Sequence, residues 1–267
     1  MRACGALKRY GTVQFMMDHD RSAGGGTARF AFSGAGDVAA LARRYRERGH
    51  VRIAGFLPND TANALRTELL NSDRWTQVFN MGDRLYELDG VARAALTPAE
   101  WGELDRSIMA NARTGFQFRY ETIRVPDGRF ARERDGSLLG RFARWLATPD
   151  MLDRFSTFTG LADLRFADVQ ATRYRPGDLL TGHDDAIKGK HRRAAYVLGL
   201  TPHWRLEWGG ALMFNRGADA ADAWMPGFNC IDIFAVPQMH SVSYVTEAAA
   251  FPRLSVTGWL RAEYPPA

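Results

Sequence analysis

Residues 181–191 read TGHDDAIKGKH and place two histidines and two aspartates within nine positions. Imidazole nitrogens and carboxylate oxygens bind metals, so the segment is either part of a metal site or a solvated polar loop. On an extended segment, residues i and i+2 point to the same side. This parity predicts that His183 and Asp185 act together and that Asp184 points away. His191 lies in the basic stretch KGKHRR, where we expect a residue that faces solvent or substrate.

The third ligand must come from elsewhere, and His240 is the best placed of the remaining histidines. It begins the run HSVSYV, directly after the apolar run CIDIFAV and the turn at 237–239. We expect His240, Val242 and Tyr244 to share one face of a strand. Two histidines and one carboxylate, with other positions open, suit a non-haem Fe(II) that activates dioxygen. A His-x-Asp pair alone is common in polar loops, so the prediction depends on the rest of the C-terminal half.

A second cluster of polar residues follows in PRLSVTGWL, at 252–260. On a strand, Arg253, Ser255, Thr257 and Trp259 share a face. A guanidinium that faces the inside of a barrel is unfavourable unless it binds an anion. Its planar fork can hold both oxygens of a carboxylate. The alternative is a partly exposed strand on which Arg253 meets solvent.

These residues lie in a region of short apolar or alternating runs, separated by turn residues, that begins near residue 160. This spacing is typical of an all-β sandwich or barrel. We therefore predict an α+β protein in which a helix-rich supporting part, residues 36–160, packs on a β-barrel core, residues 161–267, within a single domain. Residues 1–35, which include GGG at 24–26, are predicted to form a flexible leader.

The supporting part has its own start and stop signals. Asp37 is a predicted N-cap for a helix, and Thr97 to Glu100 form a predicted capping box with proline at the first helical position. We expect further helices over 59–73 and 137–160, the latter broken at Thr148-Pro149. Strands are expected over 51–57 and 116–125, with a hairpin whose two strands are WTQVFN and RLYELD.

The composition of the chain indicates which binding partners and which cellular compartment to expect. The net charge is +5 in 267 residues, which favours acidic partners, and nucleic acid or ribonucleoprotein is possible although no motif indicates it. No apolar run approaches the length of a membrane span, so no membrane partner is expected. The N-terminal residues do not read as a signal peptide, and the two cysteines make no disulfide framework. We therefore expect a cytoplasmic protein. The oligomeric state cannot be read from the sequence.

The ordered pattern resembles a known family. His-x-Asp, a histidine 55 residues after Asp185, and Arg-x-Ser thirteen residues later ending in Gly-Trp are similar to the iron(II)/2-oxoglutarate-dependent oxygenases. RRAAYVLGL, the Trp-x-x-x-x-Gly-Gly turn of WRLEWGGALMFN, and PRLSVTGWL look like the prolyl 4-hydroxylase-like branch. The resemblance covers roughly residues 165–262, and VRIAGFLPND looks like the entry segment of that branch. It implies a double-stranded β-helix, a jelly-roll barrel, in the C-terminal half with supporting helices from the N-terminal half.

Carried over to this sequence, the resemblance implies that His183, Asp185 and His240 are catalytic ligands of Fe(2+). Arg253 would pair with the distal carboxylate of 2-oxoglutarate, with Tyr174 bonded to the same carboxylate and Ser255 as a helper. O2 would be the other cosubstrate, and ascorbate is a possible addition. The implied reaction hydroxylates a prolyl residue of a protein, or a small amino-acid-like molecule, and yields succinate and CO2.

Two alternatives stay open. A cupin-like barrel that binds a metal or a small acid without oxygenase activity would share the histidines and make no use of Arg253. A nucleic-acid dealkylase would carry a second arginine about six residues after the first, a position that Trp259 occupies here. The sequence departs from the family pattern at Ala211, where many relatives have glutamate after Gly-Gly. Collagen-type prolyl hydroxylases have lysine at the position of Arg253, so collagen is not the expected substrate.

Overall fold

The computed structural model describes residues 28–34, 36–217 and 219–264. The helices of the described part are α1 (Val38–Arg48), α2 (Asn59–Leu70), α3 (Gly90–Ala95), α4 (Pro98–Ala112), α5 (Arg129–Arg134), α6 (Leu138–Leu146) and α7 (Pro149–Thr159), with a 3-10 turn η1 (Leu206–Trp208). The strands of the supporting part are β1 (His50–Ala54), β2 (Thr76–Met81), β3 (Arg84–Leu88) and β4 (Phe118–Arg124). Those of the C-terminal half are β5 (Phe166–Ala167), β6 (Gln170–Tyr174), β7 (Leu179–His183), β8 (Arg192–Leu200), β9 (Leu212–Asn215), β10 (Ala221–Trp224), β11 (Phe228–Ala235), β12 (His240–Val242) and β13 (Arg253–Arg261).

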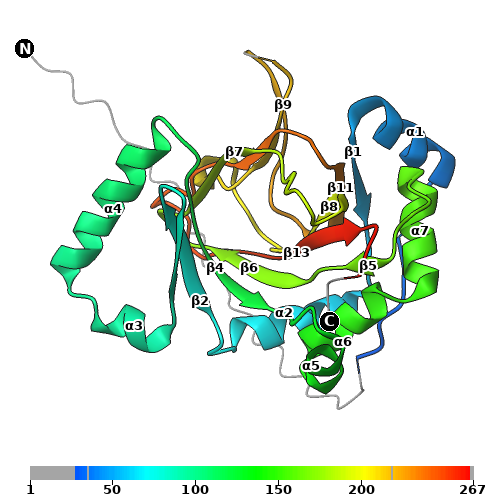
Figure 1. The fold of residues 1–267 in the computed structure, drawn as a ribbon, viewed down its shortest axis with the longest axis horizontal. Coiled ribbons are helices and arrows are strands. Elements are labelled where there is room, and N and C mark those ends of the chain that lie inside the picture. Colours follow the sequence, from blue (N-terminus) through cyan, green and yellow to red (C-terminus); the bar gives the residue numbers. More distant parts are fainter. Residues whose placement is uncertain (1–27, 35, 218, 265–267) are drawn as a thin grey trace, which may run out of the picture.

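All strands belong to one curled antiparallel sheet (Figure 1). Its order is β1-β11-β8-β13-β6-β4-β7-β12-β9-β10, with β2 and β3 branching from β4 and β5 attached to β13. The first six strands form a larger face and the last four a smaller one. Because β4 pairs with both β6 and β7, it joins the two faces. The curl of the sheet thus creates a hollow between the faces.

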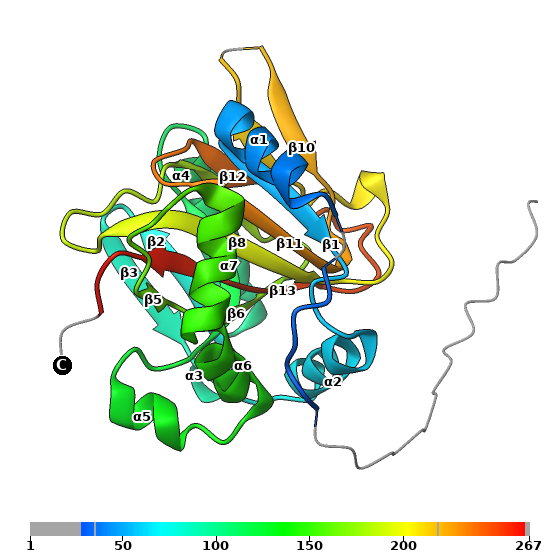
Figure 2. The same ribbon diagram turned by 90° about the vertical axis from the view of Figure 1, so that its right-hand side faces the viewer.

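Helices α1, α2, α6 and α7 cover the outer side of the larger face, where α7 crosses the strands in Figure 2, whereas α3 and α4 pack beside β2, β3 and β4. Alternation along β8 explains this arrangement, because Tyr196 and Leu198 belong to the core shared with the helices. Ala195 and Val197 belong instead to the core inside the barrel. Gly258 on β13 is required for the same packing, since a Cβ there would lie 1.9 Å from the carbonyl oxygen of Asp168. The helical layer therefore supports the strands and leaves the inner side free for a site.

The expected N-terminal elements are confirmed. Asp37 caps α1 by accepting hydrogen bonds from the backbone of residues 39 and 40. The capping box between Thr97 and Glu100 starts α4. The hairpin is β2 and β3, and the break at Thr148-Pro149 separates α6 from α7. Helices α3 and α5 are each six residues long and were not predicted, because so short a segment carries too little periodicity.

The predicted leader is wrong for its described part. Residues 1–27 of that prediction lie outside the described residues. Residues 28–34 have no helix or strand, but they pack on the core rather than forming a leader. The ring of Phe30 stacks on Trp145 at 5.7 Å, and Phe32 lies against Phe56 at 5.8 Å. Packing of these two partly buried rings on the core fixes a segment whose polar and glycine-rich surroundings suggested mobility.

The strand predicted over HSVSYV is shorter than expected. β12 ends at Val242, and Tyr244 is 39% exposed, with its hydroxyl donating to Glu247. The prediction that Tyr244 shares the face of His240 is therefore wrong. Tyr244 lies against the turn at Gly209 and Gly210, where the Gly210 N–H donates to its carbonyl oxygen and a Cβ on Gly209 would lie 2.0 Å from that oxygen. Among the described residues, we find no helix with the length and apolar character that a membrane span requires.

Candidate metal centre and adjoining cavity

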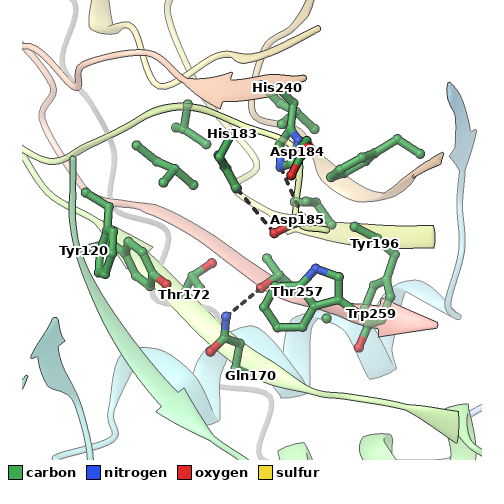
Figure 3. Close-up of a pocket in the computed structure, with 18 of the residues that line it drawn as sticks. Tyr120, Gln170, Thr172, His183, Asp184, Asp185, Tyr196, His240, Thr257 and Trp259 are labelled. Atoms are coloured by element: carbon green, nitrogen blue, oxygen red, sulfur yellow. Dashed lines mark hydrogen bonds and ion pairs between the residues drawn. The ribbon is translucent and has the colours of Figure 1, made fainter. Parts of the chain in front are cut away.

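Three side chains predicted as ligands converge at one point inside the barrel (Figure 3). His183 ends β7 and His240 begins β12, and the two are register partners in adjacent antiparallel strands. Their rings lie 4.1 Å apart. One ligand atom from each of His183, Asp185 and His240 lies within 4.8 Å of the others. The structure thus brings together the triad that the sequence predicted.

Backbone carbonyls orient both imidazole rings in the same way. Nδ1 of His183 lies 3.1 Å from the carbonyl oxygen of Thr181, and Nδ1 of His240 lies 2.8 Å from that of Gln238. A carbonyl only accepts, so each Nδ1 carries a proton, and in a neutral imidazole the lone pair that a metal would take is then on Nε2. The two Nε2 atoms lie 3.4 Å from Oδ1 and Oδ2 of Asp185, respectively. Such outer contacts set the tautomer that a metal requires.

Asp185 reaches this point for a reason other than strand parity. β7 ends at His183, and Asp185 has a φ of 62°, in the left-handed region. The turn, and not an extended segment, directs its carboxylate between the two imidazoles. The structure therefore brings the predicted pair together, whereas the parity argument that selected it is wrong. Aspartate is among the residues that enter this region most readily, which makes the conformation accessible.

The protonation states suit metal binding at neutral pH. In the metal-free site, burial raises the pKa of Asp185, but His183 and His240, which donate to its oxygens and carry charge when they are protonated, outweigh burial and hold the pKa below its usual range. Burial and the neighbouring His183 lower the pKa of His240 to about 4. One ionised carboxylate and a neutral imidazole are thus available as ligands.

The triad lines a cavity of about 410 Å³. Arg253 lines the same cavity from the first position of β13 and is 5% exposed. Its guanidinium makes no ion pair with any described residue, although it lies 5.0 Å from the ring of Tyr174. A buried cation without a counter-charge is unfavourable unless a ligand supplies one. The cavity is therefore lined by both a candidate metal site and a buried guanidinium without an ion-pair partner.

Tyr174 and Ser255 take different places relative to this cavity. Tyr174 lines it and is 4% exposed, and burial keeps its pKa far above the usual value, so the phenol stays a proton donor. Ser255 is 1% exposed and does not line the cavity. Its hydroxyl lies 2.9 Å from the hydroxyl of Thr172, which does line it. Thr172 therefore occupies the position nearest a ligand, with Ser255 behind it.

An aromatic wall, formed by the start of β4 and by Phe116 just before it, was missed by sequence reasoning. Phe116, Phe118 and Tyr120 line the cavity, and consecutive rings are 5.6 Å apart in both pairs. Tyr120 in turn stacks on Tyr174 at 5.2 Å. Phe116, at the outer end, is 49% exposed and lies 5.5 Å from the ring of His183. The period-two spacing in FQFRY was the available signal, since it places all three rings on one strand face.

The other polar residues of the opening segment are not ligands. Asp184 borders the cavity, but its Oδ1 accepts a hydrogen bond from the backbone N–H of Ala186 instead of joining the triad. His191 is exposed and pairs with Glu263. Arg192 lines the cavity and lies against Asp185.

Comparison with known proteins agrees with this geometry. Residues 169–261 match the 2OG-Fe(II) oxygenase superfamily. A segment of 126 residues is 31% identical to a prolyl 3-hydroxylase of Xenopus laevis and covers 44% of this chain. That segment spans only 22% of the length of the relative.

Two solved structures share the fold. A prolyl-4-hydroxylase of Pseudomonas putida has a TM-score of 0.56 and 20% identity, covering 84% of this chain and 98% of that protein. A prolyl hydroxylase of Trichoplax adhaerens, in complex with a hypoxia inducible factor peptide fragment, has a TM-score of 0.54 and 15% identity, covering 84% and 89%. These likenesses confirm the predicted double-stranded β-helix with supporting helices.

Proposed function

Because residues 169–261 match the 2OG-Fe(II) oxygenase superfamily, we propose that this protein is an Fe(II)- and 2-oxoglutarate-dependent dioxygenase. Its substrate would be a prolyl residue of a protein or a small amino-acid-like molecule. The observation that carries the proposal is the convergence of His183, Asp185 and His240 in one cavity with the unpaired guanidinium of Arg253.

The donor set fits Fe(II). Two imidazole nitrogens and one carboxylate would hold the ion and leave its remaining positions to other ligands. The free Nε2 atoms of His183 and His240 and the low pKa of Asp185 meet the requirement for deprotonated ligands. A structural zinc site would need a fourth protein ligand, and the cluster of described residues contains three.

The part of the cavity wall that carries Arg253 and Tyr174, called here the anion-binding wall, fits 2-oxoglutarate. Arg253 would hold the distal carboxylate with its planar fork, and the Tyr174 phenol beside it would donate to the same group. The apolar residues Leu212, Val242 and Phe234 also line the cavity and would limit the access of water to the ketoacid.

Bound iron, 2-oxoglutarate and O2 supply the oxidising chemistry, with succinate and CO2 as coproducts. The protein contributes position. The backbone carbonyls of residues 181 and 238 keep the two imidazoles oriented, and Arg253 would hold the far end of the cosubstrate. The aromatic wall of β4 guides the substrate to the metal, because it runs from the exposed Phe116 into the cavity.

A prolyl side chain suits this entrance. Its ring is apolar and compact, and Phe116 and Phe118 offer faces on which such a ring can lie. Ile187, which is 53% exposed, lines the cavity at the same mouth. The named activities of the Xenopus laevis and Pseudomonas putida relatives support the same substrate group. A protein segment or a free amino acid would both reach the metal by this route.

We extend the proposal to a reducing cytoplasmic compartment. Cys230 is buried and free in the described part of the chain, and a reducing environment also maintains iron as Fe(II). The cupin-like alternative is less well supported, because it leaves the buried Arg253 without a purpose.

The test follows succinate formation by the iron-loaded full chain with 2-oxoglutarate and a panel of proline-containing peptides and free amino acids. His183→Ala should abolish turnover and weaken Mn(II) binding. His191→Ala is the matched control, because His191 lies in the same segment and pairs with Glu263 outside the triad. Retention of metal affinity and turnover in His183→Ala would contradict the proposal.

A further inference from the structure

The turn that carries Asp185 has little backbone support. Asp185 lies two residues beyond the end of β7, and no backbone–backbone hydrogen bond to it is found in the described part of the chain. A left-handed φ in a residue other than glycine costs on the order of 1 kcal/mol and persists only where the surroundings impose it. Some side chain must therefore hold this ligand in place.

Arg192 makes the contacts that do so. It is the first residue of β8, seven positions after Asp185. Its Nη1 donates to the backbone carbonyl oxygen of Asp185 at 3.1 Å and lies 3.7 Å from Oδ1 of the same residue. One guanidinium thus contacts both the backbone and the carboxylate of the ligand.

Trp259 fixes the guanidinium in turn. The Arg192 guanidinium carbon lies 3.5 Å from the centre of the Trp259 ring, a stacking contact, and the arginine side chain is 11% exposed. The indole N–H of Trp259 has no hydrogen-bond partner among the described residues and points toward Asp185 in Figure 3. Trp259 lies on β13, the strand that begins with Arg253. The contact therefore links the strand of the anion-binding group to the metal ligand.

Resting on the proposed function, we infer that Arg192, stacked on Trp259, is a positioning residue that holds the Asp185 turn so that its carboxylate faces the metal. The guanidinium lies on the Oδ1 side of the carboxylate, and Oδ2 lies on the side of His240. The planar shape matters, because a lysine ammonium keeps the charge but cannot stack flat while donating to the carbonyl.

The positive charge of Arg192 and its positioning of Asp185 should change the metal affinity in opposite directions, which makes the inference testable. A positive charge 3.7 Å from Oδ1 repels a divalent cation, so a purely electrostatic role predicts tighter metal binding once the charge is removed. A positioning role predicts weaker binding, since the free carboxylate leaves the left-handed turn. The sign of the change in metal affinity separates the two.

The experiment measures Mn(II) binding to the metal-free full chain by calorimetry, and records the Co(II) absorption spectrum. Arg192→Gln and Arg192→Lys should each weaken Mn(II) binding by about 10- to 100-fold, the usual effect of removing a group that orients a metal ligand. Both should also alter the Co(II) spectrum. Arg193→Gln is the control, because the next residue pairs with Asp163 and does not line the cavity.

Thermal unfolding of the metal-free variants shows whether each one is folded, so a loss of affinity can be assigned to the site. Parent-like or tighter Mn(II) binding in Arg192→Gln would overturn the inference while the proposed function stands. So would parent-like binding in Arg192→Lys alone, since charge without the planar group would then suffice. Absence of Mn(II) binding by the parent chain would overturn the proposed function itself.

Discussion

Replacing Arg253 by methionine tests the anion-binding wall most directly. The guanidinium is 5% exposed, lines the cavity and has no carboxylate partner among the described residues. Its nearest described aromatic contact is the ring of Tyr174, at 5.0 Å. If the arginine exists to bind a dicarboxylate, Arg253→Met should weaken 2-oxoglutarate binding without harming the fold.

The magnitude follows from the geometry of a bidentate pair. Two hydrogen bonds between charged groups contribute about 1.5 to 3 kcal/mol each, or roughly 3 to 6 kcal/mol together. At about 1.4 kcal/mol per factor of ten, 2-oxoglutarate affinity should fall by about 10²- to 10⁴-fold. In the ligand-free protein, Arg253→Met removes a buried cation–π contact worth about 2 kcal/mol. It also removes a buried charge with no partner, so the free energy of unfolding should stay level or rise.

Calorimetry of 2-oxoglutarate into the Mn(II)-loaded protein, together with denaturant unfolding of the ligand-free protein, measures both effects. Arg132→Met is the matched control, because Arg132 is also 5% exposed but donates to the carbonyl oxygens of Ala143 and Ala167 away from the cavity. It should lower stability and leave 2-oxoglutarate affinity unchanged. An Arg253→Met protein that is destabilised and binds 2-oxoglutarate like the parent would refute the reasoning and favour the cupin-like alternative.

Three further predictions concern the substrate wall, the N-terminal packing and pH. Phe118→Ala should weaken peptide binding by the roughly 1 to 3 kcal/mol that a stacking ring contributes, which appears as a higher KM. The Mn(II) affinity should not change. An unchanged KM would exclude the β4 wall as the substrate route. Phe32→Ala should lower the free energy of unfolding by about 2 to 4 kcal/mol, since its ring packs on Phe56 and Phe158; a neutral result in denaturant melts would show that residues 28–34 are dispensable. Burial raises the pKa of Asp178 to about 7. Between about pH 4 and pH 7 the folded state therefore binds more protons than the unfolded state, and the free energy of unfolding should fall as the pH rises through this range. Asp178→Asn should flatten that slope in unfolding experiments at several pH values, and an identical slope in both proteins would exclude Asp178 as its source.

The metal ligands could be predicted because their chemistry restricts both residue type and order along the chain. His183, Asp185, His240 and Arg253 each had a physical reason to be polar in an otherwise apolar region, and the structure brings the first three together beside the fourth. The local conformation could not be predicted. Parity assumed an extended chain through Asp185, whereas its φ of 62° depends on Arg192, which only the folded chain brings near.

The same distinction, between local sequence pattern and contacts formed only in the folded chain, explains why residues 28–34 were predicted to belong to a flexible leader. Phe30 and Phe32 are two aromatic residues among glycine, serine and arginine, and composition over such a window favours disorder. Their packing partners are Trp145 and Phe56, which follow at distances of 115 and 24 residues along the chain. Short-range patterns carry no information on such contacts, so burial of the segment becomes visible only when the helical layer is assembled.

The aromatic wall shows how topology, rather than composition, turns an ordinary strand into part of a site. The alternation in FQFRY was visible and correctly predicted a strand, but either face of that strand could have been the buried one. β4 pairs with β6 on one edge and with β7 on the other. One neighbour carries Tyr174 and the other carries His183, so the face of β4 between them must look into the cavity. A strand from the supporting half therefore joins the end of the cavity near Tyr174 to the end near His183. Substitutions on the inner face of β4 should weaken substrate binding more than they weaken metal binding.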